Sequence, residues 1–114
     1  MIVKEIVLPA PREDVWDALT EPERLEDWFA NDVELDLRPG GGASFRWSNG
    51  EERHATVIDV EPEERLSFRW EGEDEGEVEF TLADHDEGTR LVVVESSPAW
   101  STALDVQALA GSRV

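Results

Sequence analysis

The sequence contains no cysteine, and only two of its 114 residues are histidine, His54 and His85. The absence of cysteine excludes a disulfide, a thiolate nucleophile and a thiolate metal site. No spacing pairs the two histidines as metal ligands or as a base with a nucleophile. We therefore expect no metal site, no cofactor and no catalytic residues.

Long apolar segments are also missing. No apolar run approaches the roughly 20 residues that cross a bilayer as a helix, and residues 1–5, MIVKE, lack the basic-then-apolar order of a secretion signal. The chain is long enough for one hydrophobic core and too short for two. We therefore expect a cytoplasmic protein that forms a single domain over residues 1–114, with no membrane span.

Basic residues are scarce. The chain has 10 Lys and Arg residues against 28 Asp and Glu residues, which gives a formal net charge of −18. Such an acidic surface repels the phosphates of a nucleic acid, so we expect no nucleic-acid partner. Two explanations of the charge stay open: adaptation to a salty cytoplasm, and a GC-rich genome that favours arginine codons.

The first third of the chain predicts one strand followed by two short helices. Residues 2–8 are mostly apolar and β-branched, as in a strand. Pro11 is predicted at the first position of a helix, and the tetrapeptide TEPE at 20–23 matches a capping box at the start of the second helix. The apolar residues of that second helix share one face: Leu25, Trp28 and Phe29.

From residue 33 onward apolar and polar residues alternate, which predicts antiparallel strands with one covered face and one wet face. The tetrapeptide SFRW occurs twice, at 44–47 and at 67–70, and each copy places Phe and Trp on one side of a strand. No similarity extends beyond these four letters. We therefore interpret the copies as two strands of one sheet and not as a duplication.

A last helix is predicted after Ser97 and Pro98, ending near Gly111. Its apolar arc holds Trp100 and Leu104, with several alanines that make it slender. At about 18 Å this helix is too short to cover the whole sheet. We therefore expect a partly open pocket, with a weak homodimer as the competing arrangement.

Four segments carry a resemblance to a known family: APREDVWDALTEPERLEDWF at 10–29, LRPGG at 37–41, VIDVEPEERLSFRW at 57–70 and GTRLVVVES at 88–96. In this order they resemble bacterial members of the START-like (SRPBCC) superfamily. The most similar subgroup is named after the C-terminal domain of the activator of the heat-shock-protein-90 ATPase. The resemblance implies an α+β helix-grip fold with a curved antiparallel sheet of about six to seven strands. Two short helices come after the first strand, and a C-terminal helix packs on the concave face.

The resemblance and the aromatic face together predict non-catalytic binding of a small apolar or amphipathic ligand in a hydrophobic cavity between sheet and final helix. The residues expected to line this cavity are Phe45, Trp47, Phe68, Trp70, Phe80, Trp100 and Leu104. Two alternatives stay open: a protein-interaction or co-chaperone-like module with a chaperone partner, and an enzyme of the cyclase or dehydratase type. The candidate polar groups inside the cavity are Arg53, Asp59 and Glu95.

Two stretches that suggest ion or phosphate sites are interpreted as turns. RPGGGASF at 38–45 lacks the Lys-Ser/Thr ending and the following helix of a phosphate loop. DHDEGTRLVVVE at 84–95 lacks the central glycine and the flanking helices of a calcium loop.

The net charge of −18 generates a prediction about salt. Repulsion among surface carboxylates is screened as the Debye length falls from about 10 Å at 0.1 M to about 3 Å at 1 M salt. The melting temperature should therefore rise between 0.1 M and 1 M sodium chloride, measured by thermal unfolding. A flat or falling melting temperature would contradict strong repulsion and a saline habitat alike.

Overall fold

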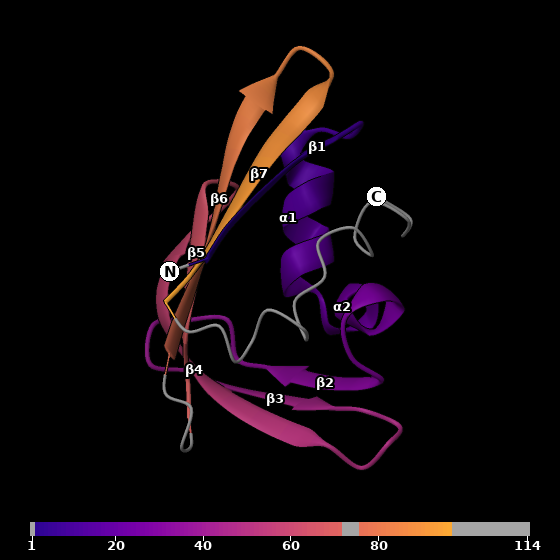
Figure 1. Cartoon of the computed structure of the whole chain (residues 1–114), viewed down its shortest axis with the longest axis vertical. Coiled ribbons are helices and arrows are strands. Elements are labelled where there is room, and N and C mark those ends of the chain that lie inside the picture. The colour runs from indigo at the N-terminus through magenta and orange to yellow at the C-terminus, as the bar shows by residue number, and fades with distance from the viewer. Residues whose placement is uncertain (1, 72–75, 97–114) are drawn as a thin grey trace.

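The computed structural model describes residues 2–71 and 76–96, which form a seven-stranded sheet with two helices on one side of it (Figure 1). The elements follow one another in this order: β1 (Ile2–Leu8), α1 (Arg12–Thr20), α2 (Pro22–Trp28), β2 (Asp32–Leu35), β3 (Gly42–Arg46), β4 (Glu52–Glu61), β5 (Arg65–Trp70), β6 (Gly76–His85) and β7 (Gly88–Glu95). The predicted order of one strand, two helices and a meander is confirmed. The helix predicted after Ser97, with Trp100 and Leu104, lies outside the described residues.

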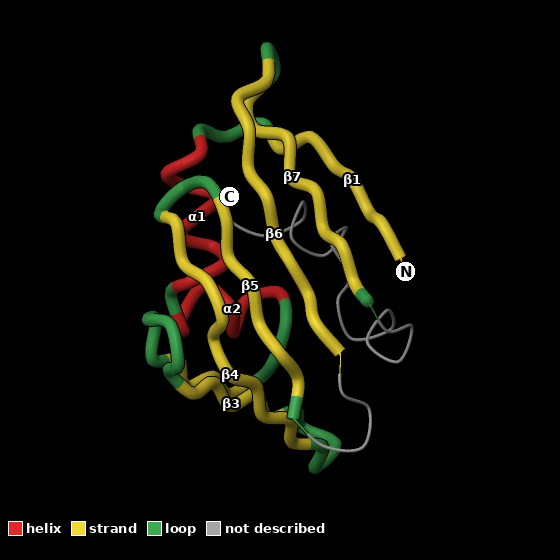
Figure 2. The backbone as a smooth tube through the Cα atoms, turned by 90° about the vertical axis from the view of Figure 1, so that its left-hand side faces the viewer, coloured by secondary structure: helices red, strands yellow, loops and turns green. Residues whose placement is uncertain are grey.

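The sheet is antiparallel throughout, with the spatial order β1-β7-β6-β5-β4-β3-β2. From β2 to β7 each strand pairs with the next one in the sequence, whereas β1 pairs with β7, from Ile2 opposite Glu95 to Leu8 opposite Thr89. Figure 2 shows these two strands side by side at one end of the sheet. The N-terminal strand therefore extends the surface that the meander builds.

The sheet curves around the helices, and β2 and β3 run across the direction of β6 and β7 (Figure 1). A β-bulge lies in β4, where Val57 pairs with Phe68 and Asp59 pairs with Ser67, so that Ile58 is one residue too many. An extra residue of this kind bends a strand and increases its twist. The bulge therefore contributes to the curvature that lets one face wrap around α1 and α2.

The inner face, defined as the side that α1 and α2 cover, carries the hydrophobic core. α1 packs over β6 and β7, and α2 packs against β2. Alternation along the strands sends every second side chain into this face. The outer face carries mostly polar residues, with Val3 and Ile58 as exposed apolar exceptions. The buried apolar residues of the inner face are Leu8, Val33, Ala43, Phe45, Ala55, Val57, Leu66, Phe68, Trp70, Val78, Phe80, Leu82, Leu91 and Val93.

The two SFRW copies differ at their last residue. In β5 both Phe68 and Trp70 are buried on the inner face, as the alternation predicts. In the first copy Phe45 is buried, but β3 ends at Arg46 and Trp47 is only half-buried beyond it. Both copies lie in strands of one sheet, which confirms the prediction. Their tryptophans are not equivalent, because Trp70 is buried and Trp47 is half-buried.

The predicted helix starts are wrong in detail. The N-cap of α2 is Glu21 and Pro22 is its first residue, so Thr20 does not cap this helix. Thr20 belongs to the last turn of α1, and its hydroxyl donates a hydrogen bond to the Trp16 carbonyl oxygen four residues back (2.8 Å). Pro11 is likewise the N-cap of α1 rather than its first residue. Only Glu21 separates the two helices, so Thr20 is part of α1 and cannot also be the N-cap of α2.

The start of β7 is fixed against the junction between β1 and α1. The Thr89 hydroxyl donates a buried hydrogen bond to the Ala10 carbonyl oxygen (2.7 Å). Beside it Gly88 has a φ of +141°, and a Cβ atom there would clash with the backbone oxygen of Leu8. A glycine is therefore required at 88 both by its backbone conformation and by the close approach of two chain segments.

We expect Gly88→Ala to destabilise the protein by about 3 kcal/mol or more, because backbone atoms have to move apart. Gly50→Ala is the matched control, since Gly50 also has a positive φ of +92° but no atom within 4 Å of the added Cβ. It should cost only the conformational strain, about 1–2 kcal/mol. Urea unfolding of the two variants measures the difference, and equal losses would contradict the close approach.

Candidate functional site

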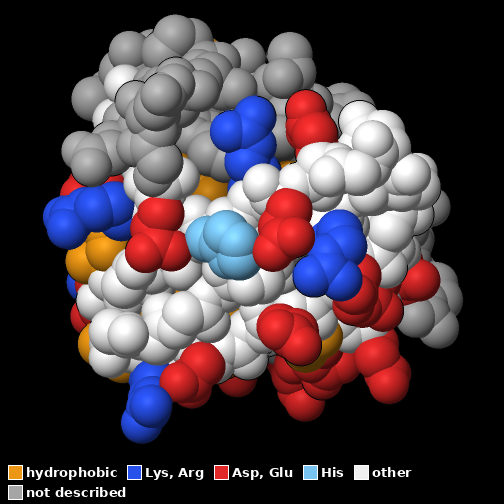
Figure 3. Space-filling model, turned by 90° about the horizontal axis from the view of Figure 1, so that it is seen from below, with side chains coloured by type: hydrophobic (Ala, Val, Ile, Leu, Met, Phe, Trp, Pro, Cys, Tyr) orange, Lys and Arg blue, Asp and Glu red, His pale blue; other side chains and the backbone are white. Residues whose placement is uncertain are grey.

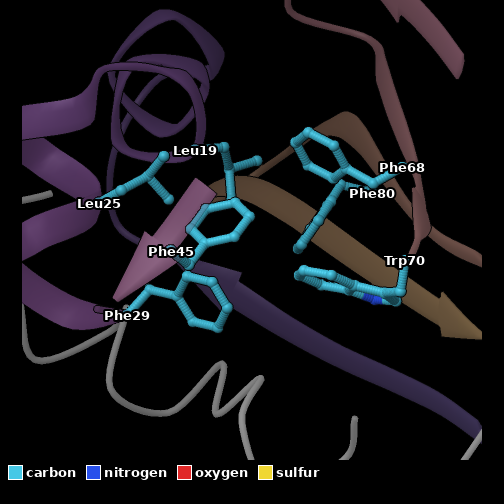
Figure 4. Close-up of a pocket in the computed structure, with 7 residues that line it drawn as sticks. All are labelled: Leu19, Leu25, Phe29, Phe45, Phe68, Trp70 and Phe80. Atoms are coloured by element: carbon cyan, nitrogen blue, oxygen red, sulfur yellow. The ribbon is translucent and has the colours of Figure 1, made fainter. Parts of the chain in front are cut away.

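Seven apolar side chains from the sheet and from both helices surround one pocket (Figure 4). The space between them is about 290 Å³ with the solvent at its open mouth included, and it has room for little more than one water molecule. In Figure 4 the side chains of Leu19 and Leu25 point from the helices toward the aromatic rings of the sheet. The lining residues are Leu19, Leu25, Phe29, Phe45, Phe68, Trp70 and Phe80.

The aromatic rings hold one another in place by edge-to-face contacts. Phe45 is the central ring, with its centroid 5.0 Å from that of Phe29 and 5.5 Å from that of Trp70. Phe68 and Phe80 meet at 6.5 Å with an interplanar angle of 85°. Such contacts add about 0.5–1.5 kcal/mol per pair beyond burial. The rings thus form one packed aromatic cluster.

Four of the seven cavity residues predicted from the sequence, namely Phe45, Phe68, Trp70 and Phe80, lie in the walls of this pocket. Trp47 lies outside the walls. Its Nε1 donates a hydrogen bond to the Phe29 carbonyl oxygen (2.8 Å), and its ring stacks edge-on against the Phe29 ring. Trp47 therefore fixes the position of Phe29, which ends α2 and lines the pocket. Trp100 and Leu104 lie outside the described residues.

The contribution of the helices to the pocket was not predicted from the sequence. Leu25 and Phe29 were expected to share one helical face, but neither was expected to line the cavity. Leu19, Leu25 and Phe29 in fact supply the side of the pocket opposite the sheet. The apolar spacing along α2 is the signal that could have identified them.

The three polar residues predicted inside the cavity, Arg53, Asp59 and Glu95, differ in the face they occupy and in their burial. Asp59 follows the bulge of β4 and accepts hydrogen bonds from Arg65 (2.9 Å) on the outer face. Arg53 is half-buried on the inner face, in register with Phe45. Glu95 alone is buried, with 1% of its side chain exposed, and it shares the inner face with Leu91 and Val93.

The Glu95 carboxylate has an unusual environment. Its nearest cation is Lys4 of β1, whose Nζ lies 3.6 Å from Oε2. Neither carboxylate oxygen accepts a hydrogen bond within the described residues. Burial raises the pKa of Glu95 above its ordinary value of 4.5, and the Lys4 ammonium opposes this shift only in part.

His54 has partners that the sequence spacing did not reveal. On the outer face its Nδ1 lies 3.0 Å from the Ser44 hydroxyl oxygen, and its Nε2 lies 3.0 Å from a Glu52 carboxylate oxygen. Sequence spacing does not reveal this contact, because it is the register of β3 and β4 that places Ser44 opposite His54. Half of the His54 side chain is exposed, and the neighbouring backbone belongs to strands paired on both sides. The group thus lacks the buried site and the free N–H donors that an acyl-transfer reaction needs.

The outer face also carries exposed ion pairs. Figure 3 shows acidic side chains interspersed with Lys and Arg on one side of the molecule. Arg69 pairs with Glu77 and Arg90 pairs with Glu5 across neighbouring strands. Among residues 2–71 and 76–96 no group of three or more His, Asp or Glu side chains is placed to hold a metal ion. No helix in that part of the chain is long and apolar enough to cross a membrane.

Comparison with known proteins identifies the family. The family model described as Activator of Hsp90 ATPase homolog 1-like protein matches residues 9–110. The chain belongs to this family. It is thereby a member of the START-like (SRPBCC) superfamily, which confirms the resemblance seen in the sequence.

Solved structures of the same fold include proteins of several bacteria. BH1534 of Bacillus halodurans is 33% identical, with a TM-score of 0.73 over 84% of this chain and 67% of its own. MLL2253 of Mesorhizobium loti is 28% identical, with a TM-score of 0.77 over 84% of this chain and 75% of its own. DynU16, a protein in the dynemicin biosynthetic locus, is 29% identical with a TM-score of 0.84; 96% of this chain matches 45% of DynU16. A search of curated proteins finds no match.

The raised pKa of Glu95 generates a prediction about pH. A carboxyl with a raised folded-state pKa binds its proton more tightly in the folded protein than in the unfolded chain. Its contribution to stability is complete below pH 4.5 and is lost as the pH rises through the raised pKa. Glu95→Gln removes this titration, so the melting temperature of the variant minus that of the wild type should increase from pH 4 to pH 8.

Glu34→Gln is the control for this measurement, because Glu34 is exposed on β2 and its loss reports only the general effect of removing one negative charge. The increase with pH should be larger for Glu95→Gln than for Glu34→Gln. A difference that decreases with pH would show that the attraction of Lys4 outweighs the burial of the carboxylate.

Proposed function

We propose that the protein binds a small apolar or amphipathic molecule in the pocket between the sheet and the two helices. The observation that carries this proposal is the convergence of seven apolar side chains from α1, the α2 region and three strands on one space. Ligand pockets are typically concave, mostly apolar and built by side chains from several elements. The final helix predicted by the sequence would add Trp100 and Leu104 to the same site.

The strength of binding depends on the apolar area that a ligand buries. A ligand that buries about 200 Å² of apolar surface gains about 5 kcal/mol, which corresponds to a dissociation constant of about 0.2 mM. Because the free space in the pocket is small, a ring-sized ligand enters only as the lining aromatic side chains change rotamer. Binding should therefore be weak for the smallest ligands and should strengthen with apolar area.

A non-catalytic role follows from the chemistry of the walls. The seven lining side chains are all aliphatic or aromatic and offer no acid, base or nucleophile. The likeness to DynU16 supports a role with small molecules, since that protein belongs to a biosynthetic locus. On this proposal the protein carries, protects or senses a small molecule rather than converting it.

A second candidate is a co-chaperone-like protein-interaction module, favoured by the family to which the chain belongs. The two candidates differ in what they predict for the pocket. An interaction module needs no small molecule, so titration of apolar ligands would leave its melting temperature unchanged, whereas a ligand that binds the folded state raises it.

The pocket itself is tested by filling it. Leu25→Phe places a larger side chain at the pocket, at a cost of about 1–3 kcal/mol of stability from overpacking. It should weaken binding of the neutral dye Nile red about tenfold, measured by dye fluorescence at a temperature where the variant is folded. Leu35→Phe is the matched control, because Leu35 packs against the core without lining the pocket.

Equal dye affinity in the wild type and both variants would place the dye elsewhere on the protein. The absence of saturable binding to the wild type would contradict the proposed function and favour the interaction module.

A further inference from the structure

Glu95 lies on the same inner-face row as the aromatic wall of the pocket. In the register of the sheet Glu95 of β7 is opposite Val78 of β6, and Val78 is opposite Phe68 of β5. Neighbouring strands are about 4.8 Å apart, so two strand spacings, about 10 Å, separate the backbone at Glu95 from that at Phe68. A single valine separates the carboxyl-bearing position from the pocket wall.

Among residues 2–71 and 76–96, Lys4 is the cation that faces the Glu95 carboxylate, and the other neighbours are apolar. Its cross-strand neighbours are Ile2 and Val78, and the next inner-face residue of its own strand is Val93. With 1% of the side chain exposed, solvent does not replace the missing hydrogen bonds; Oε2 faces the Lys4 ammonium at 3.6 Å, and Oε1 has no hydrogen-bond partner within the described residues. A buried acceptor left unsatisfied costs about 1–3 kcal/mol or more, so a group of this kind calls for a partner.

We propose that Glu95 accepts a hydrogen bond from the hydroxyl group of an amphipathic ligand whose apolar body lies over Val78 against Phe68 and Phe80. This inference rests on the proposed function and names the class of ligand: a neutral, ring-sized alcohol or phenol. Val78 and Glu95 are each 1% exposed and neither lines the pocket, so the ligand reaches the carboxylate only as the side chains that cover Val78 move. The pocket then supplies the apolar contacts, and Glu95 supplies the acceptor that orients the molecule.

The charges at this end of the inner face select against ionised ligands. An anionic ligand such as a carboxylate meets the Glu95 carboxylate as well as a protein of net charge −18. A cationic ligand meets the Lys4 ammonium, which already lies 3.6 Å from the carboxylate. A neutral hydroxyl brings a donor without a second charge, and its desolvation costs less than that of an ion.

Three small naphthalenes test the inference because they share one apolar body. They are 2-naphthol, which has a hydroxyl donor, 2-methoxynaphthalene, which has no donor, and 2-naphthoate, which is anionic. Their affinities are measured by displacement of Nile red from the wild type, from Glu95→Leu and from Glu95→Gln. Glu95→Leu removes the acceptor, Glu95→Gln keeps an acceptor oxygen without the charge, and thermal unfolding verifies that each variant is folded.

The wild type should bind 2-naphthol about tenfold more tightly than 2-methoxynaphthalene, as expected for one hydrogen bond to a charged group. Glu95→Leu should reduce this ratio to about 1 without weakening the ether, and Glu95→Gln should leave part of the preference. The anion should bind least tightly to the wild type.

Equal affinity of the wild type for the alcohol and the ether would overturn the role of Glu95 while leaving the apolar pocket as the binding site. A preference for 2-naphthol that persists in Glu95→Leu would also overturn it. If none of the three naphthalenes displaces the dye, the proposed function fails together with this inference.

Discussion

The structure depends on the need to cover one apolar face of a long sheet with short helices. Strands β4 and β6 have ten residues each and extend for about 33 Å, whereas α1 has nine residues and α2 has seven, about 14 Å and 11 Å. The sheet responds by curving, with the help of the bulge at Ile58, so that its aromatic residues face the helices. The pocket lies where Leu19 and Leu25 of the helices meet those rings. Fold stability and the binding surface therefore rest on the same side chains.

Polar chemistry is distributed very unevenly over the two faces of this sheet. The outer face holds exposed pairs such as Arg69 with Glu77, and surface pairs of this kind contribute little to stability. The inner face admits few ionisable groups, and Glu95 is the one buried to 1% exposure within the described residues. A carboxylate retained there against the cost of burial is hard to explain by stability alone. A role in binding a ligand would explain why a carboxylate is buried at this position.

Much of the fold was predictable because the alternation of apolar and polar residues marks each strand and its buried side. Alternation from residue 33 onward identified the strands and the inner position of Phe45, Phe68, Trp70 and Phe80. Capping at Thr20 was misassigned because sequence alone does not show that two helices follow without a linker. The contact of His54 with Ser44, and the separation of Glu95 from Asp59, depend on which residues face each other across strands. The strand register and the bulge in β4 decide which residues are cross-strand neighbours. The strand propensities of single residues do not determine them.

The central claim is that an apolar molecule binds between the helices and the inner face. It is tested most directly by a nuclear magnetic resonance titration of labelled protein with naphthalene, with intermolecular contacts recorded at saturation. The account predicts contacts from naphthalene to the methyl groups of Leu19 and Leu25 and to the ring protons of Phe68 and Phe80. Contacts confined to outer-face residues such as Ile58, or no saturable shift at all, would contradict it.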